Sequence, residues 1–350
     1  MAKNALVTGI TGQDGAYLSK FLLDKGYNVF GLYRRLSTPN FWRLRYLEIF
    51  EKVSLIPGDL IDVGSLLDAI RISHPDEVYN LASQSFVGAS FEQPICTGEM
   101  SGLGVTRFLE TIRIINPSIK FYQASTSELF GNGHSTTLNE ESLFKPSSPY
   151  AAAKLYGYWM TRIYREGFDI FACNGLLFNH ESPIRGLEFV TRKITNAAAK
   201  ISLGLEKGLR LGNLDAHRDW GYAPDYVESM WLMLQQDKPD DYVVASNESH
   251  SVREFAEKAF DVVGLDWQEY VHVDKKFLRP LDVCFLKGDP SKINKIGWKL
   301  KVDFDSLVKI MVKEDVSRWE RWLKGERFPW DASNYPGEDK ILSRYQKKEK

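Results

Sequence analysis

The chain has little cysteine: Cys96, Cys173 and Cys284 are the only three among its 350 residues. None lies near another in the sequence, so their spacing suggests neither a CxxC metal site nor a dense disulfide framework. Scattered single cysteines are typical of a reducing compartment. We therefore expect a cytoplasmic protein without a bound metal.

The chain also lacks an excess of charge and long apolar runs. Its formal net charge is −1 and neither sign forms a long block, which argues against nucleic acid or an anionic membrane as the main partner. No apolar run is long enough to span a bilayer. The first residues lead directly into Asn4–Gly9, a pattern typical of a strand and a turn rather than of a signal peptide.

Strand-like and helix-like segments alternate through the first half of the chain. The expected strands are Ala5–Thr8, Tyr27–Tyr33, Val53–Ile56, Glu77–Leu81, Lys120–Ser125 and Ile170–Phe178. The expected helices are Gln13–Lys25, Ser65–Ile72, Thr97–Ile115 and Tyr150–Glu166. Such alternation implies right-handed βαβ crossovers, and so it predicts an α/β fold around a parallel sheet.

The alternation loosens after about Asn179. The expected helices there are Val190–Leu203, Ser251–Val263 and Phe304–Trp322, and the expected strands are Arg210–Leu214 and Tyr242–Ala245. We therefore predict one domain over residues 1–180 and a smaller mixed domain over 181–345. The second domain is expected to be discontinuous, with segments returning to the first, and the active site is expected in the cleft between them.

A glycine-rich turn, Gly9-Ile-Thr-Gly12-Gln-Asp-Gly15, follows the first expected strand and opens a helix. Glycines at such a turn allow a dinucleotide pyrophosphate to approach the backbone closely at the positive end of the helix. The spacing is GxxGxxG rather than GxGxxG, and an ordinary βα turn remains the alternative. The context favours a dinucleotide cofactor.

Arg35 stands at the end of the second expected strand, where sites that prefer NAD usually carry an acid. A guanidinium instead suits a ribose 2′-phosphate, so Arg35 predicts NADP. The alternative is a plain surface arginine. Asp59 and Leu60 follow the third strand, where a carboxylate can meet the adenine amino group.

Two proton-transfer groups occur downstream. Tyr150 and Lys154 are four residues apart and therefore share one face of a helix. A neighbouring ammonium favours the phenolate, so this pair can exchange a proton. Glu128, at the end of the strand that leads into Ser125-Thr126-Ser127, adds a carboxylate. Such a site could run oxidation and elimination in sequence.

These residues together resemble the extended short-chain dehydrogenase/reductase superfamily, which implies a Rossmann-type, doubly wound parallel sheet with a smaller C-terminal substrate domain. Longer strings resemble the GDP-mannose 4,6-dehydratase family: Asn80-Leu-Ala-Ser-Gln-Ser85, Tyr122-Gln-Ala-Ser-Thr-Ser-Glu-Leu129, Leu177-Phe-Asn-His-Glu-Ser-Pro183, Val190-Thr-Arg-Lys-Ile194, Leu211-Gly-Asn-Leu-Asp215 and Arg218-Asp-Trp-Gly221. The resemblance covers nearly the whole chain. It implies a homo-oligomer, a dimer or tetramer, that acts on GDP-mannose with NADP.

The resemblance also implies roles for single residues. Tyr150 would take the proton of the sugar 4-hydroxyl, Lys154 would hold the nicotinamide ribose and lower the tyrosine pKa, and Thr126 would bind the 4-oxygen. Glu128 would remove the C5 proton and promote loss of the 6-hydroxyl. The sequence departs from related patterns at Ser127, where dTDP-glucose dehydratases carry Asp, and at Cys96, where the family usually has a tyrosine against the cofactor.

The expected ligand contacts form two sets. The cofactor set is Gly9, Thr11, Gly12, Gln13, Asp14, Gly15, Arg35, Asp59, Leu60, Leu81, Ala82, Ser83, Gln84, Ser85, Tyr150, Lys154, His180 and Arg185. The substrate set is Ser85, Glu128, Asn179, Lys193, Arg218 and Arg279. Basic groups fit a diphosphate substrate. A structural role for His180, and a surface or interface role for Arg218, remain the alternatives.

Two other functions remain open at this point. Another nucleotide-sugar enzyme, a 4-epimerase or a 4-keto reductase, would share the tyrosine and lysine, but an epimerase has no need of Glu128 as a C5 base. A catalytically silent NADP-binding regulator is the other, and it need not retain all of Thr126, Glu128, Tyr150 and Lys154.

Overall fold

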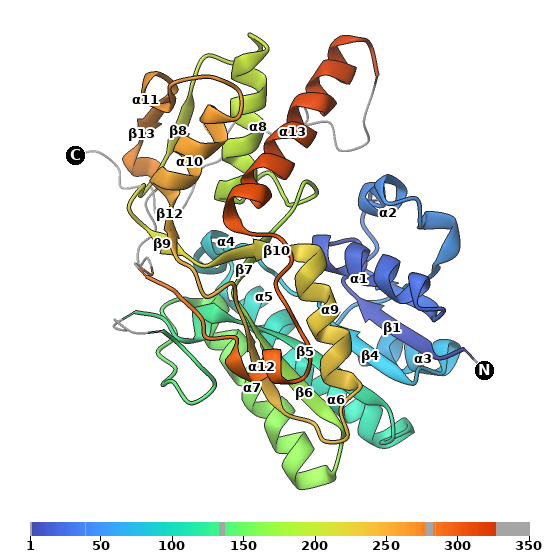
Figure 1. The fold of residues 1–350 in the computed structure, drawn as a ribbon. Helices are drawn as coiled ribbons and strands as arrows, with labels where there is room; N and C mark the ends of the chain where they lie inside the picture. The colour runs from blue at the N-terminus through green and yellow to red at the C-terminus, as the bar shows by residue number, and fades with distance from the viewer. Residues whose placement is uncertain (1, 39, 133–136, 278–282, 284, 327–350) are drawn as a thin grey trace.

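Seven parallel strands form the central sheet of the computed structural model, which describes residues 2–38, 40–132, 137–277, 283 and 285–326 (Figure 1). The strands are Asn4–Thr8 (β1), Asn28–Tyr33 (β2), Ser54–Pro57 (β3), Glu77–Asn80 (β4), Lys120–Thr126 (β5), Ala172–Leu177 (β6) and Asp241–Val244 (β11). They lie in the order β11-β6-β5-β4-β1-β2-β3, and every neighbouring pair is parallel. The predicted α/β fold is confirmed.

Helices cover both faces of this sheet (Figure 1). Successive side chains of a strand point to opposite faces, and the core follows that rule: Tyr122 of β5 packs with one group of helices and Phe121 with the other. The first group is α1 (Gln13–Asp24) and α9 (Ala223–Leu234), and the second is α3 (Val63–Ser73), α6 (Gly104–Ile115) and α7 (Pro149–Phe168). Both faces are therefore buried, which explains why the strands lack polar alternation.

One expected helix contains a π-helical turn. The segment predicted as a single helix over Thr97–Ile115 consists of α5 (Pro94–Gly98), a π-helical turn over Glu99–Leu103, and α6. Glycine weakens a helix interior, and here it also allows close packing. A Cβ on Gly104 would lie 2.9 Å from the Leu60 Cβ atom. The expected helix is present over its whole length, with a π-helical turn within it.

A second hydrophobic core lies away from the sheet, in the upper part of Figure 1. Trp220 packs there against Phe255 and Phe304. The elements around it include α8 (Val190–Ser202), α10 (Val252–Asp261), α13 (Phe304–Leu323), β8 (Leu209–Leu211) and β13 (Val271–Val273). The structure therefore has one core around the sheet and a second core away from it. The predicted boundary between two domains at residue 180 stays a prediction.

Two short strand pairs lie between these parts of the chain. Asn179–Glu181 (β7) pairs in parallel with Trp220–Tyr222 (β10), and His217–Arg218 (β9) pairs antiparallel with His250–Ser251 (β12). The remaining helices are α2 (Trp42–Tyr46), α4 (Val87–Glu92), α11 (Trp267–Tyr270) and α12 (Ser291–Lys295). The sequence patterns missed α9 and both of these strand pairs.

Two further observations apply to the described residues. None of their helices combines the length and the apolar character needed to cross a membrane. Their His, Cys, Asp and Glu side chains form no cluster of three that could hold a metal ion.

Candidate active site

The glycine-rich turn between β1 and α1 packs tightly against neighbouring backbone. Gly9 has φ +67°, and a Cβ there would lie 2.9 Å from the Ala82 backbone nitrogen. A Cβ on Gly15 would lie 2.3 Å from the Gly9 carbonyl oxygen. The helix begins after Gly12 without a side-chain cap, so its first N–H groups are not satisfied by a capping side chain. This turn has the features of an anion cradle.

Three of the expected cofactor residues bind one another. His180 lies between two acceptors, with Nδ1 2.7 Å from the Phe178 carbonyl oxygen and Nε2 2.9 Å from Asp14 Oδ2. Gln13 donates from Nε2 to the His180 carbonyl oxygen at 3.1 Å and accepts from Ser182 Oγ at 2.7 Å. These bonds fasten the first turn of α1 to β7.

In the Asp14–His180 pair the imidazole is buried and the carboxylate is partly exposed. Burial would raise the pKa of Asp14, but the charge and hydrogen bond of His180 outweigh it and lower that pKa to about 2. Burial would lower the pKa of His180, but Asp14 reverses this effect and the pKa is raised. With an acceptor at each ring nitrogen, the geometry also favours a doubly protonated imidazolium.

The adenosine-side candidates lie at the ends of β2 and β3. Arg35 is exposed and forms no hydrogen bond or ion pair with a described residue. Asp59 accepts a hydrogen bond from the Ile61 N–H at 3.2 Å, and Leu60 is buried. Arg35 is thus available to a ligand, whereas Leu60 also serves the core.

The segment 81–85 follows β4 at the same edge of the sheet. The N–H groups of Leu81 and Ala82 both donate to Thr8 Oγ1 at 3.0 Å, so the end of β1 fixes the start of this loop. Ala82 also lies against Gly9. The side chains that follow it are Ser83, Gln84 and Ser85, of which Ser85 is exposed.

The four expected catalytic residues come from the end of β5, the 3-10 turn Ser127–Leu129 that follows it, and α7, and all are buried. Thr126 ends β5, and its Oγ1 accepts the Glu128 N–H at 3.2 Å. Tyr150 lies in the first turn of α7, and its ring centroid is 5.9 Å from Lys154 Nζ. Ser148 caps α7 and Pro149 occupies its first position, so the helix begins here. This start places the Tyr150 phenol near the end of β5.

Burial dominates the electrostatics of this set. Burial raises the pKa of Tyr150 to about 12, Thr126 opposes the rise through a hydrogen bond, and the Glu128 charge adds to it. Lys154 instead donates to the Ala124 carbonyl oxygen at 2.9 Å, and burial lowers its pKa to about 8. Desolvation is the largest cause of both shifts, and the expected lowering of the tyrosine pKa by Lys154 stays a prediction.

The basic candidates for the substrate lie farther along the chain. Lys193 Nζ lies 4.1 Å over the Phe277 ring, and Arg218, which is buried in β9, donates to the Val283 carbonyl oxygen at 2.6 Å. Asn179 opens β7 and pairs with Trp220. Arg279 lies outside the described residues.

Arg185 adjoins the same region. Its Nε atom lies 3.2 Å from Glu181 Oε2, and its guanidinium lies 3.6 Å over the Phe189 ring. Sequence reasoning missed a second arginine here, Arg43, which donates to the carbonyl oxygens of Thr11 and Ile184. No local pattern links positions so distant in the sequence, so only the fold reveals this contact.

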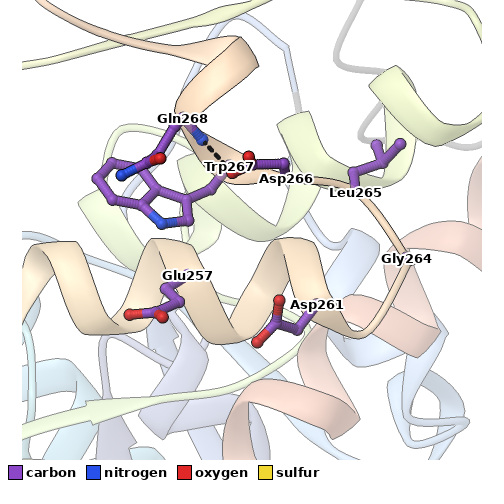
Figure 2. Close-up of a pocket in the computed structure, with 7 residues that line it drawn as sticks. All are labelled: Glu257, Asp261, Gly264, Leu265, Asp266, Trp267 and Gln268. Carbon is purple, nitrogen blue, oxygen red and sulfur yellow. Dashed lines mark hydrogen bonds between the residues drawn. The ribbon is translucent and has the colours of Figure 1, made fainter.

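A separate cavity of about 470 Å³ lies between α10 and α11 (Figure 2). Its lining includes the carboxylates of Glu257, Asp261 and Asp266 and the indole of Trp267. None of the expected catalytic or ligand-binding residues lines this cavity. It is therefore not part of the candidate active site.

Comparisons with known proteins agree with one another. The family model described as "GDP-mannose 4,6 dehydratase" matches residues 6–311. The chain is 52% identical over 330 residues to GDP-mannose 4,6 dehydratase 1 of Arabidopsis thaliana, with 91% of each chain covered. It is 48% identical to the human GDP-mannose 4,6 dehydratase, covering 89% of this chain and 91% of that one.

A solved structure has a similar fold. The UDP-glucose 4-epimerase of Thermus thermophilus in complex with NAD superposes with a TM-score of 0.78 at 25% identity. The match covers 89% of this chain and 98% of that one. The similarity extends over both hydrophobic cores and not only over the central sheet.

Proposed function

This chain belongs to the GDP-mannose 4,6-dehydratase family, and we propose that it converts GDP-mannose to GDP-4-keto-6-deoxymannose with NADP. The enzyme is a lyase that removes water from a nucleotide-sugar. The observation that carries the proposal is the meeting of Thr126, Glu128, Tyr150 and Lys154 at the end of β5 and the start of α7.

The residues present fit a dinucleotide. A Cβ at Gly9 or Gly15 would clash with neighbouring backbone, as expected for the tight turn and the close helix packing of a dinucleotide-binding βα unit. The exposed guanidinium of Arg35, with no partner among the described side chains, fits the extra phosphate of NADP. When bound, the cofactor accepts hydride from C4 of the hexose and later returns it to C6.

Within this site, Tyr150 removes the proton of the 4-hydroxyl while C4 is oxidised. Thr126 holds the 4-oxygen and stabilises the phenolate through the hydrogen bond that lowers the Tyr150 pKa. Lys154 supplies a positive charge beside the phenol and contacts the nicotinamide ribose. Tyr150 and Lys154 both lie on the first two turns of α7, so the helix keeps the spacing between them fixed.

Glu128 performs the elimination. The 4-keto group makes the C5 proton acidic, and the Glu128 carboxylate would remove that proton and pass it to the 6-oxygen, so that water leaves as the C6–oxygen bond breaks. Hydride would then return from the cofactor to C6, and C5 would take a proton from Glu128 after that carboxylate has been reprotonated by solvent. The reaction is redox-neutral overall, because the hydride equivalent lost by C4 is regained at C6.

The substrate diphosphate requires cations, and Lys193, Arg218 and Arg279 are the proposed partners. Ser85 and Asn179 complete the proposed contacts with the nucleotide-sugar. The cofactor binds mainly to residues 1–180 and the substrate mainly to 181–345.

We also propose a homo-oligomer, a dimer or tetramer, in the cytoplasm. Exposed apolar side chains on α5 and α7, including Ile95, Tyr156 and Trp159, support contact with a second copy of the chain. The free thiols of Cys96 and Cys173 are compatible with a reducing compartment.

A 4-epimerase remains the alternative function. The observation that favours it is the similar fold of the Thermus thermophilus UDP-glucose 4-epimerase. Glu128 favours the dehydratase, because a C4 epimerisation requires no base at C5. A 4-keto reductase would consume reduced cofactor in stoichiometric amounts.

Deuterium at C4 of GDP-mannose tests the proposal. A dehydratase should give a product that has lost water, carries deuterium at C6 and has taken a solvent proton at C5, as read by mass spectrometry and NMR. An epimerase would give a product of unchanged mass with deuterium still at C4. Either that outcome, or stoichiometric consumption of cofactor, contradicts the proposed function.

A further inference from the structure

We infer that Arg43 is a positioning residue for the cofactor, one that locks the glycine-rich turn and ties it to the segment 180–184. The inference rests on the proposed function only in placing a dinucleotide at this turn. Arg43 donates from Nη1 to the Thr11 carbonyl oxygen at 3.1 Å and from Nε to the Ile184 carbonyl oxygen at 2.7 Å. One planar side chain therefore holds two segments that lie far apart in the sequence.

The first of these bonds fixes a single peptide unit of the turn. The Thr11 carbonyl and the Gly12 N–H belong to the same planar peptide, and in a trans peptide they point in opposite directions. The carbonyl is held by Arg43, and the N–H donates to the Gly9 carbonyl oxygen at 2.9 Å. With both ends bound, this peptide cannot rotate. It lies in the turn where the backbone must present itself to the diphosphate.

The second bond leads to a segment that is already held on its other sides. Ser182 Oγ donates to Gln13 and accepts the Ile184 N–H at 3.2 Å. The Pro183 carbonyl oxygen accepts from two buried guanidinium groups, those of Arg192 in α8 and Arg318 in α13. Arg43 thus connects the cofactor turn to a backbone segment that is rigidly anchored to the second hydrophobic core.

The charge of Arg43 suits this place. Burial lowers its pKa to about 10, with Glu188 opposing that effect and Arg185 and Arg192 adding to it, so the group stays protonated at neutral pH. It forms no ion pair with a described residue. The positive charge of Arg43, which Glu188 and Asp14 offset in part, adds to the positive potential near the N-terminus of α1 that attracts an anion.

Substitutions at Arg43 and at its neighbour Arg45 separate this role from general loss of charge. Arg45 lies on the same helix but is exposed, with its guanidinium 4.2 Å over the Phe50 ring. Arg43→Met should weaken NADPH binding about tenfold or more, equivalent to about 1.4 kcal/mol. Arg43→Lys keeps the charge but lacks the planar fork, so an intermediate loss is expected. Arg45→Met should bind like the unmodified protein.

The assay is titration of each purified full-length protein with NADPH, followed by nucleotide fluorescence well below the unfolding temperature. Added guanidinium ion should restore part of the affinity of Arg43→Ala, a rescue that a purely structural loss would not give. If Arg43→Met binds within about twofold of the unmodified protein, or if Arg43→Lys binds fully while no rescue occurs, the inference is wrong. If Arg43→Met does not fold, the lysine variant and the rescue decide.

The proposed preference for NADP is tested separately from the role of Arg43. If the unmodified protein binds NADH but not NADPH, the proposed NADP preference is wrong, and the same Arg43 comparison is made with NADH. If it binds neither dinucleotide, the proposed cofactor and the inference about Arg43 are both overturned.

Discussion

Replacing Lys154 by Met should make the protein more stable while abolishing its activity. Lys154 is buried, and burial lowers its pKa from 10.5 to about 8. One pKa unit corresponds to about 1.36 kcal/mol. The protonated form is therefore disfavoured by about 3 kcal/mol in the folded protein relative to the unfolded chain. Loss of the bond to the Ala124 carbonyl oxygen offsets about 1 kcal/mol, which leaves a net gain of about 2 kcal/mol at neutral pH.

The dependence on pH identifies the cause. Between about pH 8 and pH 10.5 the unfolded chain keeps the Lys154 proton that the folded protein has lost, so the stability of the unmodified protein rises with pH in this window. Below pH 8 both states are protonated, and the full penalty applies. The Met variant has no such group. Its advantage should therefore be largest at neutral pH and should shrink as the pH rises above 8.

Urea unfolding at pH 7.0, 8.0 and 9.5, followed by tryptophan fluorescence and circular dichroism, measures this difference. Lys313→Met is the matched control, because Lys313 is an exposed lysine on α13. Its effect on the free energy of unfolding should be small and independent of pH. If Lys154→Met is less stable than the unmodified protein at pH 7, or if its advantage does not change with pH, then desolvation does not dominate at Lys154.

Three other predictions concern the chemistry. Arg35→Asp should reverse the preference for NADP over NAD, and equal affinity of the unmodified protein for both in equilibrium titration would contradict the role of Arg35. Tyr150→Phe should prevent oxidation of C4, whereas Glu128→Gln should permit that oxidation and block the loss of water. Single-turnover absorbance at the wavelength of reduced cofactor distinguishes the two variants. Equal loss of this signal in both would contradict the role of Glu128 as the elimination base. Thr126→Val removes a hydrogen bond that lowers the Tyr150 pKa, so the pH at which activity rises should move upward in a pH–rate profile, and an unchanged profile would show that Thr126 does not assist the phenol.

The sheet was predictable because its signals are local. The strand at Asn4–Thr8 is a short apolar run, and the turn after it carries glycines that the backbone requires. A parallel sheet buried on both faces gives such runs without polar alternation. The spacing of Tyr150 and Lys154 also predicted their shared helix face correctly, because i and i+4 residues are neighbours on any helix.

Contacts between distant segments were not predictable in the same way. Asp14 and His180 were each expected at the cofactor, but nothing local indicates that their side chains bind each other. The contact of Arg43 with Ile184 has the same character. The π-helical turn at Glu99–Leu103 depends on how closely other elements pack against its glycines, which periodicity does not report.

The same limit applies to the pKa values at the active site. The spacing of a tyrosine and a lysine does not report how deeply the pair is buried, so the sequence alone does not reveal the cost of desolvation. In the structure both groups are buried, and burial disfavours the phenolate and the ammonium alike, so the Tyr150 pKa rises to about 12 and the Lys154 pKa falls to about 8. Burial is the largest cause of both shifts. Two groups of the chain oppose the rise in the Tyr150 pKa: the Thr126 hydroxyl through a hydrogen bond and Arg185 through its charge. The Thr126 hydroxyl therefore assists ionisation of the phenol by direct contact.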